Sequence, residues 1–171
     1  MADSKSDSII DGHFATNSAV IPLENPLWQY ACQVYSMAGV EAALLALQDE
    51  HGADINLILQ ALWLASEGQQ WTKVCIPNDY DKWMTEQVLP LRQMRRSMKV
   101  EWPQQEGFRQ QVKKLELKAE QYALAMLFEQ SNKSSLVGQR ADHTQSNLLQ
   151  LASYLNIKPE LVLSILSTVN D

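Results

Sequence analysis

Apolar side chains recur at spacings of four, three, four, three and four residues between positions 106 and 130. The residues that carry this spacing are Phe108, Val112, Leu115, Ala119, Tyr122 and Met126. Because side chains three and four positions apart share one face of an α-helix, the pattern predicts a long helix with a narrow apolar seam. Such a seam packs against neighbouring helices in a bundle, and this one is too short for a free coiled coil.

Residues that begin and end helices divide the preceding part of the chain into four more helices. The predicted helix caps are Asn25, Asp54 and Asn78, which belong to the residue types that cap N-termini. Gly52 is expected to end the second helix in the left-handed conformation. Pro90 removes a backbone donor from the fourth helix and is expected to kink or divide it.

These patterns predict an all-α fold, a mostly antiparallel bundle of about five main helices with a C-terminal pair of short helices. We expect a flexible N-terminal tail, a helical core domain, a polar linker and the C-terminal pair, at residues 1–24, 25–130, 131–143 and 144–171. The pair comprises helices at about 144–155 and 159–169.

The composition is that of an ordinary globular protein, with 46% hydrophobic and 20% charged residues in a chain of 171. No apolar run approaches the roughly 18–20 residues that a membrane-spanning helix needs, and no secretory signal is recognisable at the N-terminus. Cys32 and Cys75 have no second thiol nearby in the sequence, which favours reduced thiols. We therefore expect a cytoplasmic protein without a membrane partner.

Positive charge is concentrated in one segment of an acidic chain. The formal net charge is −6, yet residues 91–120 hold eight Lys or Arg against four Glu. Arg92 with Arg96, and Arg95 with Lys99, are like-charge pairs four residues apart, which destabilise a helix unless opposite charges compensate. The segment therefore predicts opposite charges nearby in the fold.

An antiparallel hairpin between the fourth and fifth helices, turning at about 102–105, supplies those charges. Such a hairpin places Arg92 near Glu116, itself four residues from Glu120, and predicts a structural ion network of these three residues. Nearer the turn it collects a basic hairpin surface made of Arg95, Arg96, Lys99, Arg109 and Lys113. Arginine and lysine there suit an anion or an acidic partner, although a merely solvated basic face is the simpler interpretation.

Four ionisable residues, Asp49, Glu50, His51 and Asp54, surround Gly52 between two apolar runs. Their spacing fits neither a calcium loop nor a helical zinc motif. A helix end, a glycine turn and an aspartate cap explain the same residues. We expect no metal here, and no catalytic residue or cofactor elsewhere, because no nucleophile elbow or phosphate-binding loop is present.

The C-terminal segment resembles a helix-turn-helix in its apolar positions, with Asn156 where a left-handed turn residue belongs. As a DNA reader it is poor, because Lys158 is the nearest cation and the second helix offers no arginine. We expect this pair to dock on the core or on a protein partner.

Three sequence segments resemble an uncharacterised proteobacterial family of small helical proteins. They are "LWQYACQVYSMAGVEAALLALQDEHGADINLILQALWLA", "LPLRQMRRSMK" and "VKKLELKAE". The resemblance covers about residues 26–126 and is specific as a combination. It implies a bacterial, helical protein and carries no mechanism.

We expect a non-enzymatic cytoplasmic interaction or regulatory protein that binds another protein through the basic hairpin surface. One alternative is a nucleic-acid-binding protein, with RNA on the basic hairpin surface beside Trp102 or DNA on the C-terminal pair. Another is a small-molecule binder or enzyme with a pocket lined by Trp28, Trp63, Trp71 and Trp83.

Overall fold

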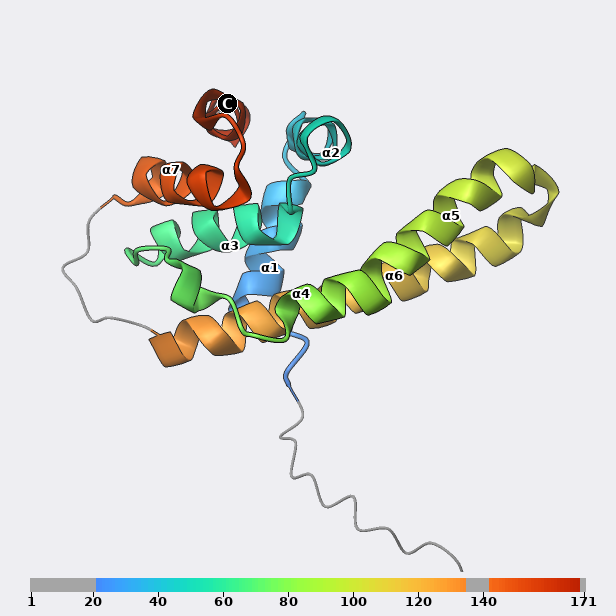
Figure 1. Ribbon diagram of the computed structural model, residues 1–171, viewed down its shortest axis with the longest axis horizontal. Coiled ribbons are helices and arrows are strands. Elements are labelled where there is room, and N and C mark those ends of the chain that lie inside the picture. Colours follow the sequence, from blue (N-terminus) through green and yellow to red (C-terminus); the bar gives the residue numbers. More distant parts are fainter. Residues whose placement is uncertain (1–20, 135–141, 170–171) are drawn as a thin grey trace, which may run out of the picture.

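The computed structural model in Figure 1 describes residues 21–134 and 142–169. All regular structure in these residues is helical, which confirms the all-α bundle. The longer helices are α1 (Pro26–Tyr35), α2 (Val40–His51), α3 (Ile55–Ser66), α5 (Leu89–Glu101), α6 (Glu106–Ser134) and α7 (Thr144–Leu155). The shorter ones are η1 (Lys73–Cys75), α4 (Tyr80–Trp83), the π-helical turn η2 (Met84–Val88), η3 (Pro103–Gln105), α8 (Pro159–Leu163) and α9 (Ile165–Val169).

Helix α3 is the centre of the body, and α1, α6 and α7 pack around it. Its residues 55–65 are all buried, so it is apolar on nearly every side. Asp54 caps its N-terminus, because one carboxylate oxygen accepts the backbone N–H of Asn56 at 2.9 Å. The other oxygen accepts the hydroxyl of Tyr80 at 2.9 Å, which ties the start of α3 to α4.

A buried polar network joins α3 to α6 and to the segment before α4. The side chain of Gln60 donates to the carbonyl of Cys75 and to the hydroxyl of Ser131, each at 2.9 Å, and accepts the indole N–H of Trp71 at 3.1 Å. The backbone N–H of Trp71 donates to Asn147 of α7 at 2.8 Å. These bonds fix α7 against the body at its buried face.

Asn25 caps α1, since its side-chain oxygen accepts the backbone N–H of Trp28 at 2.9 Å. The prediction that Asn78 caps the fourth helix is wrong. Asp79 is the residue before α4, and its side chain makes no capping hydrogen bond. The π-helical turn η2 ends at Val88, and Pro90 lies in the first turn of α5, where the missing N–H of proline is tolerated.

Helix α6 continues to Ser134, four residues beyond the end expected at 130 and into the segment expected as a linker. The expected C-terminal helix at 159–169 is present as α8 and α9, with Ser164 between them in helical φ and ψ and its N–H bonded to the carbonyl of Glu160 at 3.0 Å. Asn156 has a φ of 54° and makes the left-handed turn before α8. Residues 1–20 of the expected tail and 135–141 of the expected linker lie outside the described residues.

Candidate interaction surface on the helical hairpin

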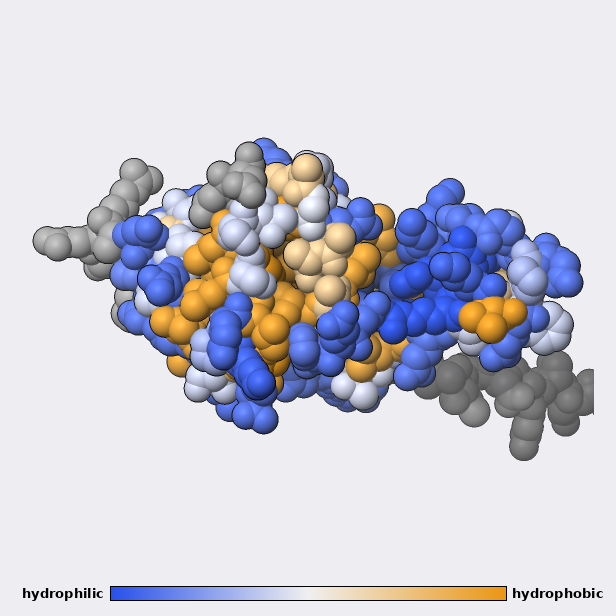
Figure 2. Space-filling model, turned by 90° about the horizontal axis from the view of Figure 1, so that it is seen from above, coloured by the Kyte–Doolittle hydropathy of each residue, from blue (hydrophilic) through white to orange (hydrophobic). Residues whose placement is uncertain are grey.

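Helix α5 and the first half of α6 form a hairpin that projects from the body of the molecule (Figure 1). We call residues 89–118 the arm. All of the arm is described, and Met98 and Val112 are its only buried apolar side chains. Seen from above, its surface is largely hydrophilic with a small hydrophobic patch near the tip, whereas the body shows broad hydrophobic areas (Figure 2). The apolar core of the arm is therefore small.

A cluster of ion pairs holds the two helices of the arm together. The buried carboxylate of Glu116 accepts two hydrogen bonds from Arg95, one of them at 3.0 Å, and lies 3.5 Å from Arg92 Nε. Arg92 also donates to Glu120 at 2.6 Å. Burial raises the pKa of Glu120, and the hydrogen bond from Arg92 opposes that effect. These four side chains neutralise one another within the hairpin.

Arg96, Arg109 and Glu106 of the arm also have charged partners. Arg96 reaches across to Asp49 of α2 at 2.5 Å, in a pair with about half of each side chain exposed. Arg109 donates to Glu106 at 2.7 and 2.5 Å, and these bonds lower the pKa of Glu106 to about 2. Three of the five residues of the basic hairpin surface therefore have a carboxylate partner within the protein, namely Arg95, Arg96 and Arg109.

Three of the four lysines of the arm lie towards its end and differ from the arginines. Lys99, Lys113 and Lys114 are exposed and make no ion pair with any residue that the structure describes. Lys99 and Lys113 belong to the basic hairpin surface, and Lys114 adds a third uncompensated charge. Near them, Trp102 and Phe108 have 58% and 55% of their surface exposed. The end of the arm thus combines free cations with exposed aromatic rings.

The seam of α6 is only half covered. Val112 and Ala119 are buried, whereas Phe108, Leu115 and Tyr122 have 55%, 59% and 40% of their surface exposed. We call these last three residues the open stripe. The periodicity of the sequence identified the shared face, and it gave no sign that half of that face stays exposed.

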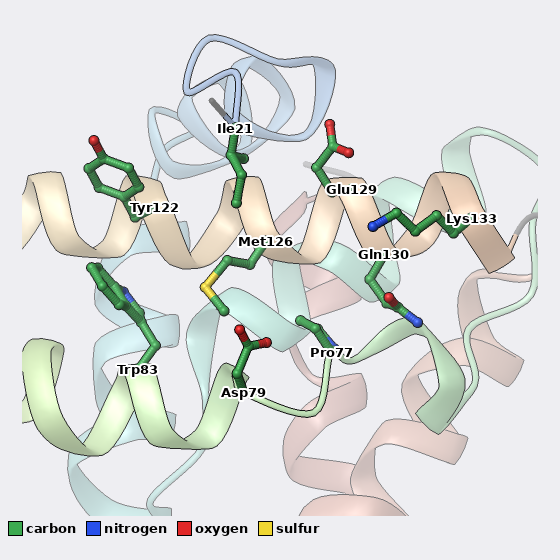
Figure 3. Close-up of a pocket in the computed structure, with 9 residues that line it drawn as sticks. All are labelled: Ile21, Pro77, Asp79, Trp83, Tyr122, Met126, Glu129, Gln130 and Lys133. Carbon is green, nitrogen blue, oxygen red and sulfur yellow. The ribbon is translucent and has the colours of Figure 1, made fainter. Parts of the chain in front are cut away.

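Beyond Tyr122 lies a surface hollow of about 340 Å³. Trp83 closes one end of it with Tyr122, with ring centroids 5.7 Å apart, and donates its indole N–H to the Ala119 carbonyl at 2.9 Å. Met126 projects into its middle (Figure 3). Asp79, Glu129 and Lys133 are the charged residues that line it.

The other tryptophans do not line either of the two hollows that were found. Trp71 is buried in the polar network, and Trp63 packs its ring 5.6 Å from that of Phe128. The second hollow, of about 440 Å³ beside Tyr154, contains no tryptophan among its described lining residues. Of the tryptophans named above, Trp83 lines the first of these two hollows.

The C-terminal pair packs on the body, with α7 against α3 and α9 against α2. Thr168 of α9 lies close to Gly39 at the start of α2. A Cβ atom on residue 39 would be 3.2 Å from the methyl group of Thr168. Val162 and Ile165 of the second helix of the pair are buried, and Glu160 and Ser164 are exposed on it.

The corner between α2 and α3 uses its ionisable residues separately. Asp49 pairs with Arg96, Asp54 caps α3, and Gly52 has a left-handed φ of 67°. The described residues contain no group of three or more His, Cys, Asp or Glu that could hold a metal ion. Cys32 is an exposed thiol and Cys75 a buried one, and neither forms a disulfide.

A family model described as "Protein of unknown function (DUF2390)" matches residues 26–127. The chain belongs to this family. The match includes the whole arm and ends within α6, so the family domain comprises α1 to most of α6 without α7 to α9. Neither the curated proteins nor the solved structures contain a match.

Within residues 21–134 and 142–169, no single helix is both long and apolar enough to cross a bilayer. Helices α1 and α2 reach that length and apolar character only together, as a pair bent by 99°.

Proposed function

We propose that this member of the family is a non-enzymatic interaction or regulatory protein that binds an acidic protein partner at the end of the arm. The observation that carries the proposal is the state of Lys99, Lys113 and Lys114, which are exposed and have no carboxylate partner among the described residues. Glu101 is also exposed there without an ion pair among the described residues and offsets one of these charges. The remaining excess of positive charge attracts a partner of the opposite sign and speeds its association.

The paired arginines support this division of roles. Arg92 and Arg95 hold the hairpin together through Glu116, so the arm has its shape before any partner arrives. Exposed Trp102 and Phe108 lie near the free lysines, and aromatic side chains are enriched at the centres of protein interfaces. The partner is therefore expected to bring carboxylates together with apolar groups.

We place the protein in the bacterial cytoplasm as part of the same proposal. The resemblance noted in the sequence supports a bacterial origin. Both cysteines are free thiols, as is usual in a reducing compartment.

The test is a crosslinked capture from cells of the source organism with the double variant Lys99→Glu, Lys113→Glu. The matched control is Lys82→Glu, Lys158→Glu, which changes the net charge equally at exposed lysines outside the arm. We expect the arm variant to lose a partner that the wild type and the control retain. A partner retained equally by all three would rule out the end of the arm as the docking site.

Nucleic-acid binding is the second candidate, favoured by the exposed indole of Trp102 beside Lys99. It predicts a mobility shift with single-stranded RNA that weakens with salt and is lost in Trp102→Ala. A shift of that kind would replace the protein partner in the proposal by RNA.

A further inference from the structure

The open stripe follows one line along α6. Phe108, Leu115 and Tyr122 are seven residues apart, which is two helical turns, so their side chains lie one above another. From the first to the last they extend about 21 Å along the helix at 1.5 Å per residue. Large apolar side chains at this spacing are the contacts that one helix offers to another.

The stripe leads into the hollow beside α4. Tyr122 belongs to both, and Met126, the next seam residue, projects into the hollow (Figure 3). A volume of about 340 Å³ accommodates a large apolar side chain at the end of a helix lying on the stripe. Stripe and hollow thus form one continuous track, and the hollow at its end is lined by apolar side chains together with Asp79, Glu129 and Lys133.

Charge beside the stripe between Leu115 and Tyr122 is positive, whereas the hollow at its end has two carboxylates, Asp79 and Glu129, and one cation, Lys133. Lys118 lies three residues after Leu115 and four before Tyr122, so it borders the stripe. Lys114 lies one helical turn before Lys118. Lys118 donates to the neutral amide of Gln121 at 3.0 Å and has no carboxylate within ion-pair distance among the described residues. Glu116 and Glu120 do not offset these lysines, because both are engaged by the arginines of α5.

We infer that the open stripe binds an amphipathic helix with an acidic edge, supplied by the protein partner. This inference rests on the proposed function and names the kind of segment that the partner contributes. Apolar side chains of that helix pack on Phe108, Leu115 and Tyr122, one of them enters the hollow, and its carboxylates face Lys114 and Lys118. The binding mode is a helix laid along a hairpin to complete a bundle of three.

A second copy of this chain fits the stripe less well. If two α6 helices crossed antiparallel at Leu115, Lys114 and Lys118 of each copy would meet the same lysines of the other. No free carboxylate of α6 borders that contact, so the like charges would destabilise it. Charge complementarity therefore favours an acidic helix from a different protein.

The experiment uses a synthetic helical peptide of about three heptads, with leucine along one face and glutamate on both sides of it. Its binding to the full chain is measured by fluorescence anisotropy at low salt, next to a peptide with lysine in place of glutamate. The test variant is Leu115→Ser. The matched control is Leu117→Ser, since Leu117 has a similar exposure of 52% but lies about 200° further round the helix.

We expect the glutamate peptide to bind the wild type and Leu117→Ser equally, and to bind Leu115→Ser at least about tenfold more weakly. The lysine peptide should bind more weakly than the glutamate peptide, and the difference should shrink as salt is added. Thermal unfolding of both variants checks that neither substitution lowers the stability of the folded chain.

Three results would overturn the inference. They are absence of glutamate-peptide binding at low salt, equal binding by Leu115→Ser, and a dimer in sedimentation that Leu115→Ser dissociates. The last would assign the stripe to a second copy.

The cell capture separates this inference from the proposed function. A partner lost with the Lys99, Lys113 variant but kept by Leu115→Ser would overturn the inference alone. A partner lost only with Leu115→Ser would overturn the proposed docking site at Lys99 and Lys113, and would still support binding at the open stripe.

Discussion

Arg95 of α5 donates two hydrogen bonds to the buried carboxylate of Glu116 of α6, and so joins the two helices of the arm where the apolar core is small. The buried negative charge of Glu116 stabilises the fold only together with the positive charges of Arg92 and Arg95. Its removal leaves Arg92 and Arg95 partly buried without a full counter-charge.

Glu116→Gln is therefore expected to lower the free energy of unfolding by about 2 kcal/mol. Urea denaturation followed by circular dichroism measures it. Glu106→Gln is the control, because Glu106 pairs with Arg109 on the exposed surface and its loss should leave stability unchanged. Equal effects of the two substitutions would show that the buried cluster does not hold the arm.

Gln60→Leu tests the buried network at the centre of the body. The substitution keeps the volume but leaves the indole N–H of Trp71 and the carbonyl of Cys75 without their partner. We expect a loss of about 2–3 kcal/mol in the free energy of unfolding, against about 1 kcal/mol for Ser131→Ala. A stabilised Gln60→Leu variant would mean that the network contributes specificity and no stability.

Asp54→Ala removes both the cap of α3 and the acceptor for Tyr80. We expect it to cost about 2 kcal/mol, of which the cap alone contributes about 1 kcal/mol. Asp54→Asn keeps an oxygen at the cap and should lose much less. Thermal or urea unfolding measures the stability of the two variants. Similar losses of stability in Asp54→Ala and Asp54→Asn would argue against the cap.

Burial raises the pKa of Asp54 above its ordinary value of 3.8, against the lowering effect of its hydrogen bonds with Tyr80 and the backbone. The folded chain therefore holds this proton more tightly than the unfolded chain does. Stability due to this group falls as pH rises from 3.8 through the folded pKa. Relative to Asp54→Asn, the wild type should gain stability as pH is lowered through that window. A difference in unfolding free energy that stays constant with pH would contradict the shift.

Local residue chemistry explains why the helical fold was predictable. Asn25 and Asp54 precede helices because their side chains accept backbone N–H groups, and Gly52 ends one because it tolerates a positive φ. Asn78 has the same chemistry, yet α4 begins after Asp79. The choice between two adjacent polar residues depends on how α4 meets the rest of the fold, which no local pattern records.

The site was predictable only in part, because it depends on contacts between distant segments. The charge pattern predicted a hairpin with Arg92 beside Glu116 and Glu120, and the structure places these groups together. The partner of Arg96 is Asp49, 47 residues away on α2, which no spacing rule indicates. Similarly, periodicity places Leu115 and Val112 on one seam but does not tell which of them a neighbour covers.

We propose that the lysines at the end of the arm, and not its paired arginines, receive the partner. The most direct measurement is the affinity of the captured partner for the wild type and for Lys99→Glu, Lys113→Glu, by titration calorimetry at low and high salt. We predict a loss of at least about tenfold in the variant and a much weaker salt dependence. An affinity and salt dependence equal to those of the wild type would contradict the account.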